Sequence, residues 1–170
     1  GVAATRSHTA ALAGSAAVTS ALFRQHGIVE VEDLDELIDT VALFERVGIA
    51  PRRGICVYSF SGGTAALAAD MVGSAGLILS ELAPGTRAGL RALAPSYAAV
   101  DNPVDLTTQV FTQDKLNRDC LSLVARDPAT DVVLLPIPAD YGPITDRSAD
   151  DMVALAPDSP ALLLPVWMSG

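Results

Sequence analysis

The segment Gly54-Ile-Cys-Val-Tyr-Ser-Phe60, followed directly by Ser61-Gly62-Gly63 and an alanine-rich run from Thr64 to about Ser74, decides the fold. Its first part is rich in apolar and aromatic residues, which favours a buried strand. The two glycines mark a tight turn, and the run that follows has helical spacing. We therefore predict a strand, a glycine turn and a helix, with Ile55 to Phe60 as an interior strand.

The same alternation continues toward the C-terminus. We expect short strands at 76–79 and 98–100, a strand at 131–137 and a last apolar run at 161–166, with helices at 84–93, 113–125 and 148–155. Strands that recur with helices between them predict right-handed crossovers and a parallel sheet. The fold class is therefore α/β, with a doubly wound parallel sheet in a three-layer α/β/α arrangement.

The first 50 residues have a different pattern. Helical segments at 10–25 and 34–47, separated by the β-branched run Ile28 to Val31, precede a linker at 48–53 that contains Pro51 and two arginines. We therefore predict a mainly helical N-terminal segment, residues 1–50, and a separate domain over residues 51–170. Both ends look cut, so we expect a fragment of a longer polypeptide that is truncated at its C-terminus.

Charge and composition exclude several classes of protein. Eleven Lys and Arg against twenty Asp and Glu give a net charge of −9, and Lys115 is the only lysine. Such a chain has no basic patch for nucleic acid and no polybasic membrane anchor. Its longest apolar stretches fall short of the ~20 residues that a bilayer requires. Cys56 and Cys120 have no metal or redox spacing, so we expect no metal site and a reducing, cytoplasmic setting.

The turn Ser61-Gly62-Gly63-Thr64 is the first candidate site. The N–H groups at the start of a helix have no partner within the helix, so they attract an anion. The motif alone is explained equally well by an ordinary strand-to-helix turn with Ser61 as N-cap.

His8 is the second candidate, because an imidazole in a loop of small hydroxyl residues can act as a nucleophile toward phosphorus. Taken alone, a histidine near a terminus is more often exposed and idle. His26 lies in the last turn of a predicted helix and is interpreted as structural. Open α/β sheets bind ligands beyond the carboxyl ends of their strands, and several polar residues follow predicted strand ends. Turn formation is the alternative explanation for each of them. These residues are Asp101, Asn102, Asp105, Asp140 and Tyr141.

An ordered set of motifs carries a family resemblance. The set consists of Ser7-His-Thr-Ala-Ala-Leu-Ala-Gly14, Ala21-Leu-Phe-Arg-Gln25, Val31-Glu-Asp-Leu-Asp-Glu-Leu37, Ser61-Gly-Gly63 with Ala65-Ala-Leu-Ala-Ala-Asp70, and Asn102-Pro-Val-Asp-Leu106. Together these motifs resemble the NDP-forming (ADP-forming) acyl-CoA synthetases, which are relatives of succinyl-CoA synthetase. The resemblance covers most of the chain.

The resemblance implies a role for each part of the chain. Residues 1–50 would hold a phosphohistidine loop and the tail of a preceding domain, and residues 51–170 a flavodoxin-like ligase-CoA domain. The residues implicated are His8 as the phosphorylated histidine, Ser61, Gly62, Gly63 and Thr64 as phosphate-binding residues, and Ser7, Asn102 and Asp105 as candidate supporting residues. ATP would phosphorylate the histidine, the phosphohistidine would convert a small carboxylic acid to an acyl phosphate, and CoA would displace phosphate.

Complete activity would require further parts. The family uses a Rossmann-type CoA-binding domain and an ATP-grasp domain, in the same or a partner chain, together with CoA, ATP or ADP, and Mg. This sequence has neither a G-x-G-x-x-G motif nor the lysines of a nucleotide cradle, so we expect the fragment to be inactive alone. Homo-oligomerisation stays open. The alternative is a ligand-binding regulatory module of a protein acetyltransferase.

Overall fold

The computed structural model describes residues 15–47, 54–113 and 115–168. Contacts divide the chain into two compact units, Gly1–Ile49 and Ala50–Gly170.

The described part of the N-terminal unit, residues 15–47, contains two helices, α2 (Ala16–Gln25) and α3 (Leu34–Val47). The predicted helix at 34–47 is confirmed. The predicted helix at 10–25 is confirmed from residue 16, and its first residues lie outside the described range. The β-branched run 28–31 forms no strand, since no neighbouring strand pairs with it in the described part of this unit. Neither helix buries a residue.

The C-terminal unit is built on a four-stranded sheet in the order β2-β1-β3-β4, in which all pairs are parallel. Its strands are β1 (Gly54–Ser59), β2 (Val104–Asp105), β3 (Thr130–Ile137) and β4 (Leu162–Trp167). Its helices are α4 (Gly62–Ser74), α5 (Pro84–Leu93), α6 (Leu116–Ala125) and α7 (Pro143–Leu155), with short 3₁₀ turns η1 (Thr108–Thr112) and η2 (Ala156–Asp158).

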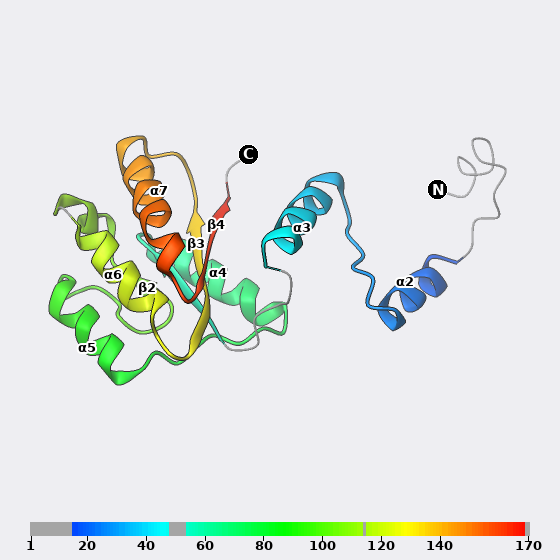
Figure 1. Cartoon of the computed structure of the whole chain (residues 1–170), viewed down its shortest axis with the longest axis horizontal. Coiled ribbons are helices and arrows are strands. Elements are labelled where there is room, and N and C mark those ends of the chain that lie inside the picture. The colour runs from blue at the N-terminus through cyan, green and yellow to red at the C-terminus, as the bar shows by residue number, and fades with distance from the viewer. Residues whose placement is uncertain (1–14, 48–53, 114, 169–170) are drawn as a thin grey trace. The chain divides into compact units, whose positions relative to one another are not determined.

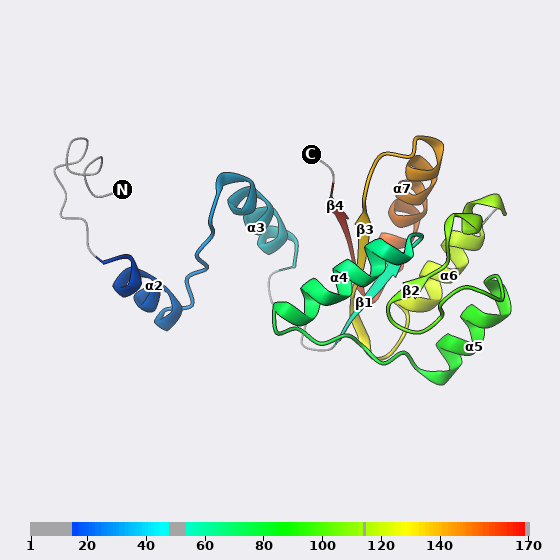
Figure 2. The same cartoon turned by 180° about the vertical axis from the view of Figure 1, so that it is seen from behind.

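Helices cover both faces of this sheet. Figure 1 shows α5, α6 and α7 on one face, and Figure 2, from behind, shows α4 on the other. The core accordingly has a large cluster that includes Leu90, Leu121 and Val133, and a small cluster beneath α4. The small cluster forms because Ala65, Ala68 and Val72 recur at helical spacing and lie against Val57 of β1. The predicted α/β fold, with an interior strand at β1, is confirmed.

The edge of the sheet beside β1 differs from the prediction. The segments at 76–79 and 98–100 are not strands, because each contributes only an isolated bridge: Leu79 pairs with Ile55, and Ala99 pairs with Asp105. Leu79 occupies the edge near the start of β1, and β2 occupies it near the end. Two short segments therefore share one edge, and neither is long enough to form a full strand.

Asn102 fills the break between these two segments. Its side-chain Oδ1 accepts a hydrogen bond from the N–H of Val57 at 3.0 Å, and its Nδ2 donates to the carbonyls of Ile55 at 2.8 Å and Ser80 at 2.9 Å. The amide therefore takes the place of a peptide group in a broken edge strand. This structural role accounts for an asparagine here without a ligand.

An Asn102→Ala variant is expected to lose about 2–3 kcal/mol of the free energy of unfolding, because the N–H of the fully buried Val57 would lose its acceptor. Urea unfolding followed by circular dichroism measures this loss. Asp101→Ala is the matched control, since Asp101 makes an exposed ion pair with Arg87 and such pairs are worth only about 0–1 kcal/mol. Equal unfolding midpoints for the two variants would contradict the role assigned to Asn102.

Candidate functional site

The turn between β1 and α4 is the candidate site. Ser61 occupies the N-cap position with extended backbone, but its side chain makes no capping hydrogen bond. Instead, the Ser61 Oγ accepts a hydrogen bond from the hydroxyl of Thr64 at 3.1 Å, and the Ser61 N–H donates to the Ser59 Oγ at 3.1 Å. The turn is therefore held by its own hydroxyls rather than by the usual N-cap bond.

The first three N–H groups of α4 are available to a ligand. The first helical N–H with an acceptor is that of Ala65, which donates to the carbonyl of Ser61 at 2.9 Å. The N–H groups of Gly62, Gly63 and Thr64 have no acceptor among the described residues. Such groups, at the positive end of a helix dipole, can bind an anion such as a phosphoryl group.

The two glycines of the turn have different surroundings. A Cβ at Gly62 would lie 2.8 Å from the Oδ2 of Asp105, so a side chain there would have to displace this carboxylate. A Cβ at Gly63 would meet nothing within 4 Å, and neither glycine has a positive φ. The space over Gly63 is therefore open, so a ligand can approach the backbone at this position.

Asp105 is brought to this turn by the register of the sheet. It lies opposite Ser59 in the pairing of β1 with β2, and its Oδ1 accepts a hydrogen bond from the N–H of Thr107 at 3.0 Å. Its other oxygen is the one that faces Gly62. The turn thus combines three N–H donors with one carboxylate acceptor. Asn102, the other polar residue of the same motif, belongs to the sheet edge described above.

The other described candidates, Asp101, Asp140 and Tyr141, make contacts of their own. His8 and Ser7 lie outside the described residues. Asp101 pairs with Arg87 at 3.3 Å on the surface, and Asp140 accepts a hydrogen bond from the N–H of Gly142 at 2.7 Å in the loop before α7. Asp101 thus forms a surface ion pair, and Asp140 stabilises a turn. Tyr141 packs its ring edge-on against Phe60, which directly precedes Ser61.

The cysteines take no part in chemistry. Cys56 and Cys120 are both fully buried free thiols. Burial raises the pKa of Cys56 far above its usual range, and burial also raises the pKa of Cys120 to about 11. Both thiols therefore stay protonated near neutral pH and pack as small apolar residues of the core. Among the described residues, no three His, Cys, Asp or Glu side chains form a group that could hold a metal ion.

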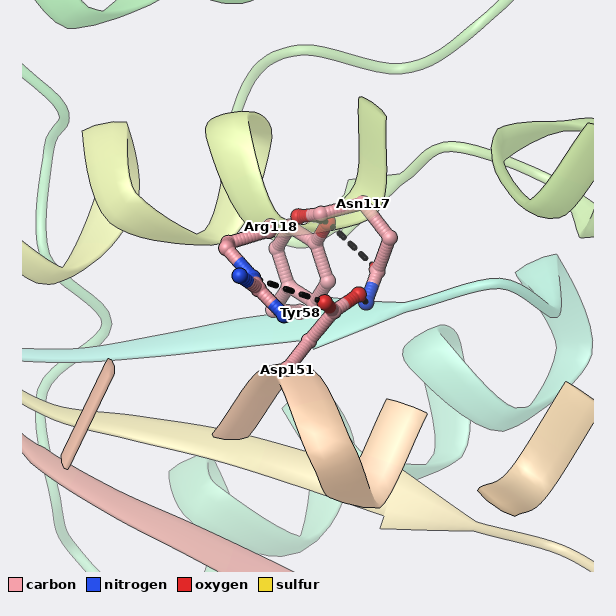
Figure 3. A network of polar contacts seen from close by, with 4 residues as sticks. All are labelled: Tyr58, Asn117, Arg118 and Asp151. Atoms are coloured by element: carbon pink, nitrogen blue, oxygen red, sulfur yellow. Dashed lines mark hydrogen bonds and ion pairs between the residues drawn. The ribbon is translucent and has the colours of Figure 1, made fainter. Parts of the chain in front are cut away.

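A network of polar side chains was not predicted from the sequence. Figure 3 shows Tyr58 of β1, Asn117 and Arg118 of α6, and Asp151 of α7. The Tyr58 hydroxyl donates to the Asn117 Oδ1 at 3.0 Å, the Asn117 Nδ2 donates to the Asp151 Oδ2 at 2.8 Å, and the Arg118 Nε donates to the Asp151 Oδ1 at 3.0 Å. Burial raises the pKa of Tyr58 well above its usual range, so the tyrosine remains a donor. No local pattern links residues this far apart in the chain.

The sequence is similar to a protein family and to several known proteins. A family model described as "Succinyl-CoA ligase like flavodoxin domain" matches residues 1–44. The chain is 31% identical over 128 residues to the alpha subunit of acetate--CoA ligase [ADP-forming] II from Pyrococcus furiosus, and it spans 27% of that protein. It is 28% identical over 106 residues to 4-hydroxybutyrate--CoA ligase [ADP-forming] from Nitrosopumilus maritimus, of which it spans 15%.

Solved structures share the fold. PH0766 from Pyrococcus horikoshii matches 93% of this chain with a TM-score of 0.73 and 25% identity. The dinucleotide forming acetyl-coenzyme A synthetase 1 of Ca. Korarchaeum cryptofilum, in complex with phosphate and ADP, matches the whole chain with a TM-score of 0.82 and 21% identity. This chain covers 36% and 37% of the two structures and a still smaller share of the relatives above. No described helix is long and apolar enough to span a membrane.

Proposed function

We infer that this chain, a relative of the ADP-forming acyl-CoA synthetases, is the part of such a ligase that receives a phosphoryl group on a histidine. The whole protein would make acyl-CoA from a small carboxylic acid, CoA and ATP in the cytoplasm. Relatives named for acetate and 4-hydroxybutyrate support a small acid as the substrate. The chain spans about a quarter or less of these relatives, so the complete reaction belongs to a larger assembly.

The start of α4 is the observation that carries this proposal. We propose that His8, supported by Ser7, bears the phosphoryl group, and that the free N–H groups of Gly62, Gly63 and Thr64 receive it. A phosphorylated imidazole is an anion, and a helix start supplies donors that need no rearrangement when the charge arrives. The hydroxyl of Ser61 lies beside the same N–H groups and supplies one further donor.

Asp105 gives this turn a preference among anions. Its carboxylate disfavours a free phosphate dianion beside Gly62. An imidazole that carries the phosphoryl group on one nitrogen has an N–H on the other only when the ring is protonated, and in that form the N–H can donate to the carboxylate. We therefore assign Asp105 a supporting role in which it favours a phosphohistidine over inorganic phosphate.

The reaction that follows from these roles is a relay. An imidazole nitrogen attacks the terminal phosphorus of ATP and ADP leaves. A carboxylate oxygen of the acid then attacks the phosphohistidine, which frees the imidazole and forms an acyl phosphate. The thiolate of CoA attacks the acyl carbon and phosphate leaves. The steps can also run in reverse to make ATP.

The nucleotide, Mg and CoA are assigned to other domains. The described residues include no group of three metal-ligating side chains, so this part of the chain does not fit a Mg site of its own. We propose that a CoA-binding domain and an ATP-grasp domain, in the same or a partner chain, hold these ligands. The family match at residues 1–44 supports assigning residues 1–50 to the end of a preceding flavodoxin-like domain, with 51–170 as the ligase-CoA domain.

An activity assay tests the proposal. The longer protein that contains this chain is expected to release ADP only when a carboxylic acid and CoA are both present, whereas the isolated 170-residue chain releases none. A coupled ADP assay with acetate and 4-hydroxybutyrate measures both. ADP release without dependence on any acid, or transfer of acetyl groups to protein lysines instead, would contradict the ligase function and would favour the regulatory alternative.

A further inference from the structure

A cavity of about 190 Å³ lies among η1, α6 and α7, on the face of the sheet opposite α4. The residues that line it are Val110, Phe111, Gln113, Lys115, Asn117, Arg118, Arg147, Asp150 and Asp151. Val110, Phe111 and Asn117 are buried, and Lys115 and Arg147 are exposed at the rim. The cavity therefore has a fixed floor and a charged opening.

Contacts within the protein hold the side chains that line the floor of the cavity. Asn117 is only 4% exposed, and it is held between the hydroxyl of Tyr58 and the carboxylate of Asp151. Arg147 stacks its guanidinium over the ring of Phe111 at 5.7 Å, and its Nη1 donates to the Phe111 carbonyl. These contacts hold the lining side chains in place before any ligand arrives, which lowers the entropy cost of binding.

Three of the eleven cationic side chains of this acidic protein gather here. Arg118 bonds Asp151 only through its Nε, so its terminal nitrogens have no acceptor among the described residues. Arg147 uses Nε and Nη1 on the carbonyls of Pro143 and Phe111, which leaves Nη2 available. The side-chain ammonium of Lys115 has no hydrogen-bond or ion-pair partner in the described ranges.

Among the described residues that line the cavity, three cationic side chains face two carboxylates, which leaves one positive charge in excess. Asp151 is already bound by Arg118 and Asn117. Asp150 is exposed and has no partner in the described part of the chain. The cavity also lies beside the first residues of α6, whose positive dipole end adds to the attraction for an anion.

We propose that this cavity binds a phosphate-bearing small molecule, at a site separate from the α4 turn and beyond the function proposed above. Guanidinium groups match phosphate with two parallel donors, and an ammonium adds a point charge. The volume is below the roughly 300–1,000 Å³ of pockets for larger ligands, so it suits a group the size of pyrophosphate rather than a whole nucleotide. The remainder of a larger ligand would extend through the open rim.

Titration of this chain with inorganic pyrophosphate, followed by amide NMR, tests the site. Shifts are expected at residues 115–118 and 147, with saturation below about 10 mM. Lys115→Gln and Arg147→Gln should each weaken binding by about three- to ten-fold. Asp150→Asn should tighten it, because that variant removes an exposed negative charge from the lining of the cavity. Arg91→Gln, an exposed arginine on α5, is the matched control and should change nothing.

A Gly63→Val variant separates this site from the α4 turn, since it alters only the turn. Unchanged shifts at 115–118 in that variant support the proposal, whatever becomes of the ligase function. Shifts confined to residues 61–64, absence of saturation, or equal affinities of Lys115→Gln, Asp150→Asn and wild type would overturn it.

Discussion

Replacing His8 by asparagine in the longer protein that contains this chain is expected to lower the rate of acyl-CoA synthesis by at least about a thousand-fold, since the variant lacks the nucleophile that we propose carries the phosphoryl group. Asparagine keeps a polar side chain of similar size but cannot form the phosphoramidate bond. The rate of acid-dependent ADP release, measured at saturating ATP, acid and CoA, reports the loss directly.

The chain contains its own control for this experiment. His26, the only other histidine, is exposed and stands at the C-cap of α2. His26→Asn should therefore leave the rate within about two-fold of wild type. Near-normal turnover of His8→Asn, or an equal loss in both variants, would show that the histidine of the Ser7-His8-Thr9 motif is not the phosphate carrier.

The second large effect is expected at the α4 turn. Gly63→Val places a branched side chain over the N–H groups of Gly62 and Thr64, and it should slow phosphohistidine formation in the full-length protein by about a hundred-fold or more. The fold should persist, because a Cβ at Gly63 meets nothing within 4 Å and its φ is not positive. Quench-flow measurement of protein-bound phosphate, with circular dichroism as the check on folding, tests both statements.

Gly85→Val is the matched control for this variant. Gly85 is the second residue of α5 as Gly63 is of α4, and a Cβ there also meets nothing within 4 Å. Both substitutions therefore place valine at the same helical position, and only one of them covers the proposed site. Equal rates of phosphorylation in folded Gly63→Val and Gly85→Val proteins would contradict the proposed phosphate-binding role. The turn would then be only a connection between a strand and a helix.

Much of the fold could be predicted because local pattern determines it. The run from Gly54 to Phe60 is apolar enough to be a buried strand, and the alanine spacing of α4 fits a helix against a sheet. The split edge beside β1 could not be predicted. Its geometry depends on Asn102 reaching residues 45 and 47 positions earlier in the chain, and no local periodicity contains that information.

Part of the candidate site could likewise be predicted from the sequence, and part could not. The glycine turn was visible because its glycines and hydroxyls are adjacent in sequence. The approach of Asp105 to Gly62 follows from strand register, and the network of Tyr58, Asn117 and Asp151 joins three separate elements. Such contacts become apparent only once the sheet is assembled.

Phosphate labelling of the full-length protein tests the central claim most directly. After incubation with γ-labelled ATP and Mg, peptide mapping under alkaline conditions is expected to find acid-labile phosphate on His8, and addition of the carboxylic acid should discharge that phosphate before CoA is supplied. Absence of the label, or stable label on any residue other than His8, would contradict the assignment of this chain as the phosphohistidine-bearing part of an acyl-CoA ligase.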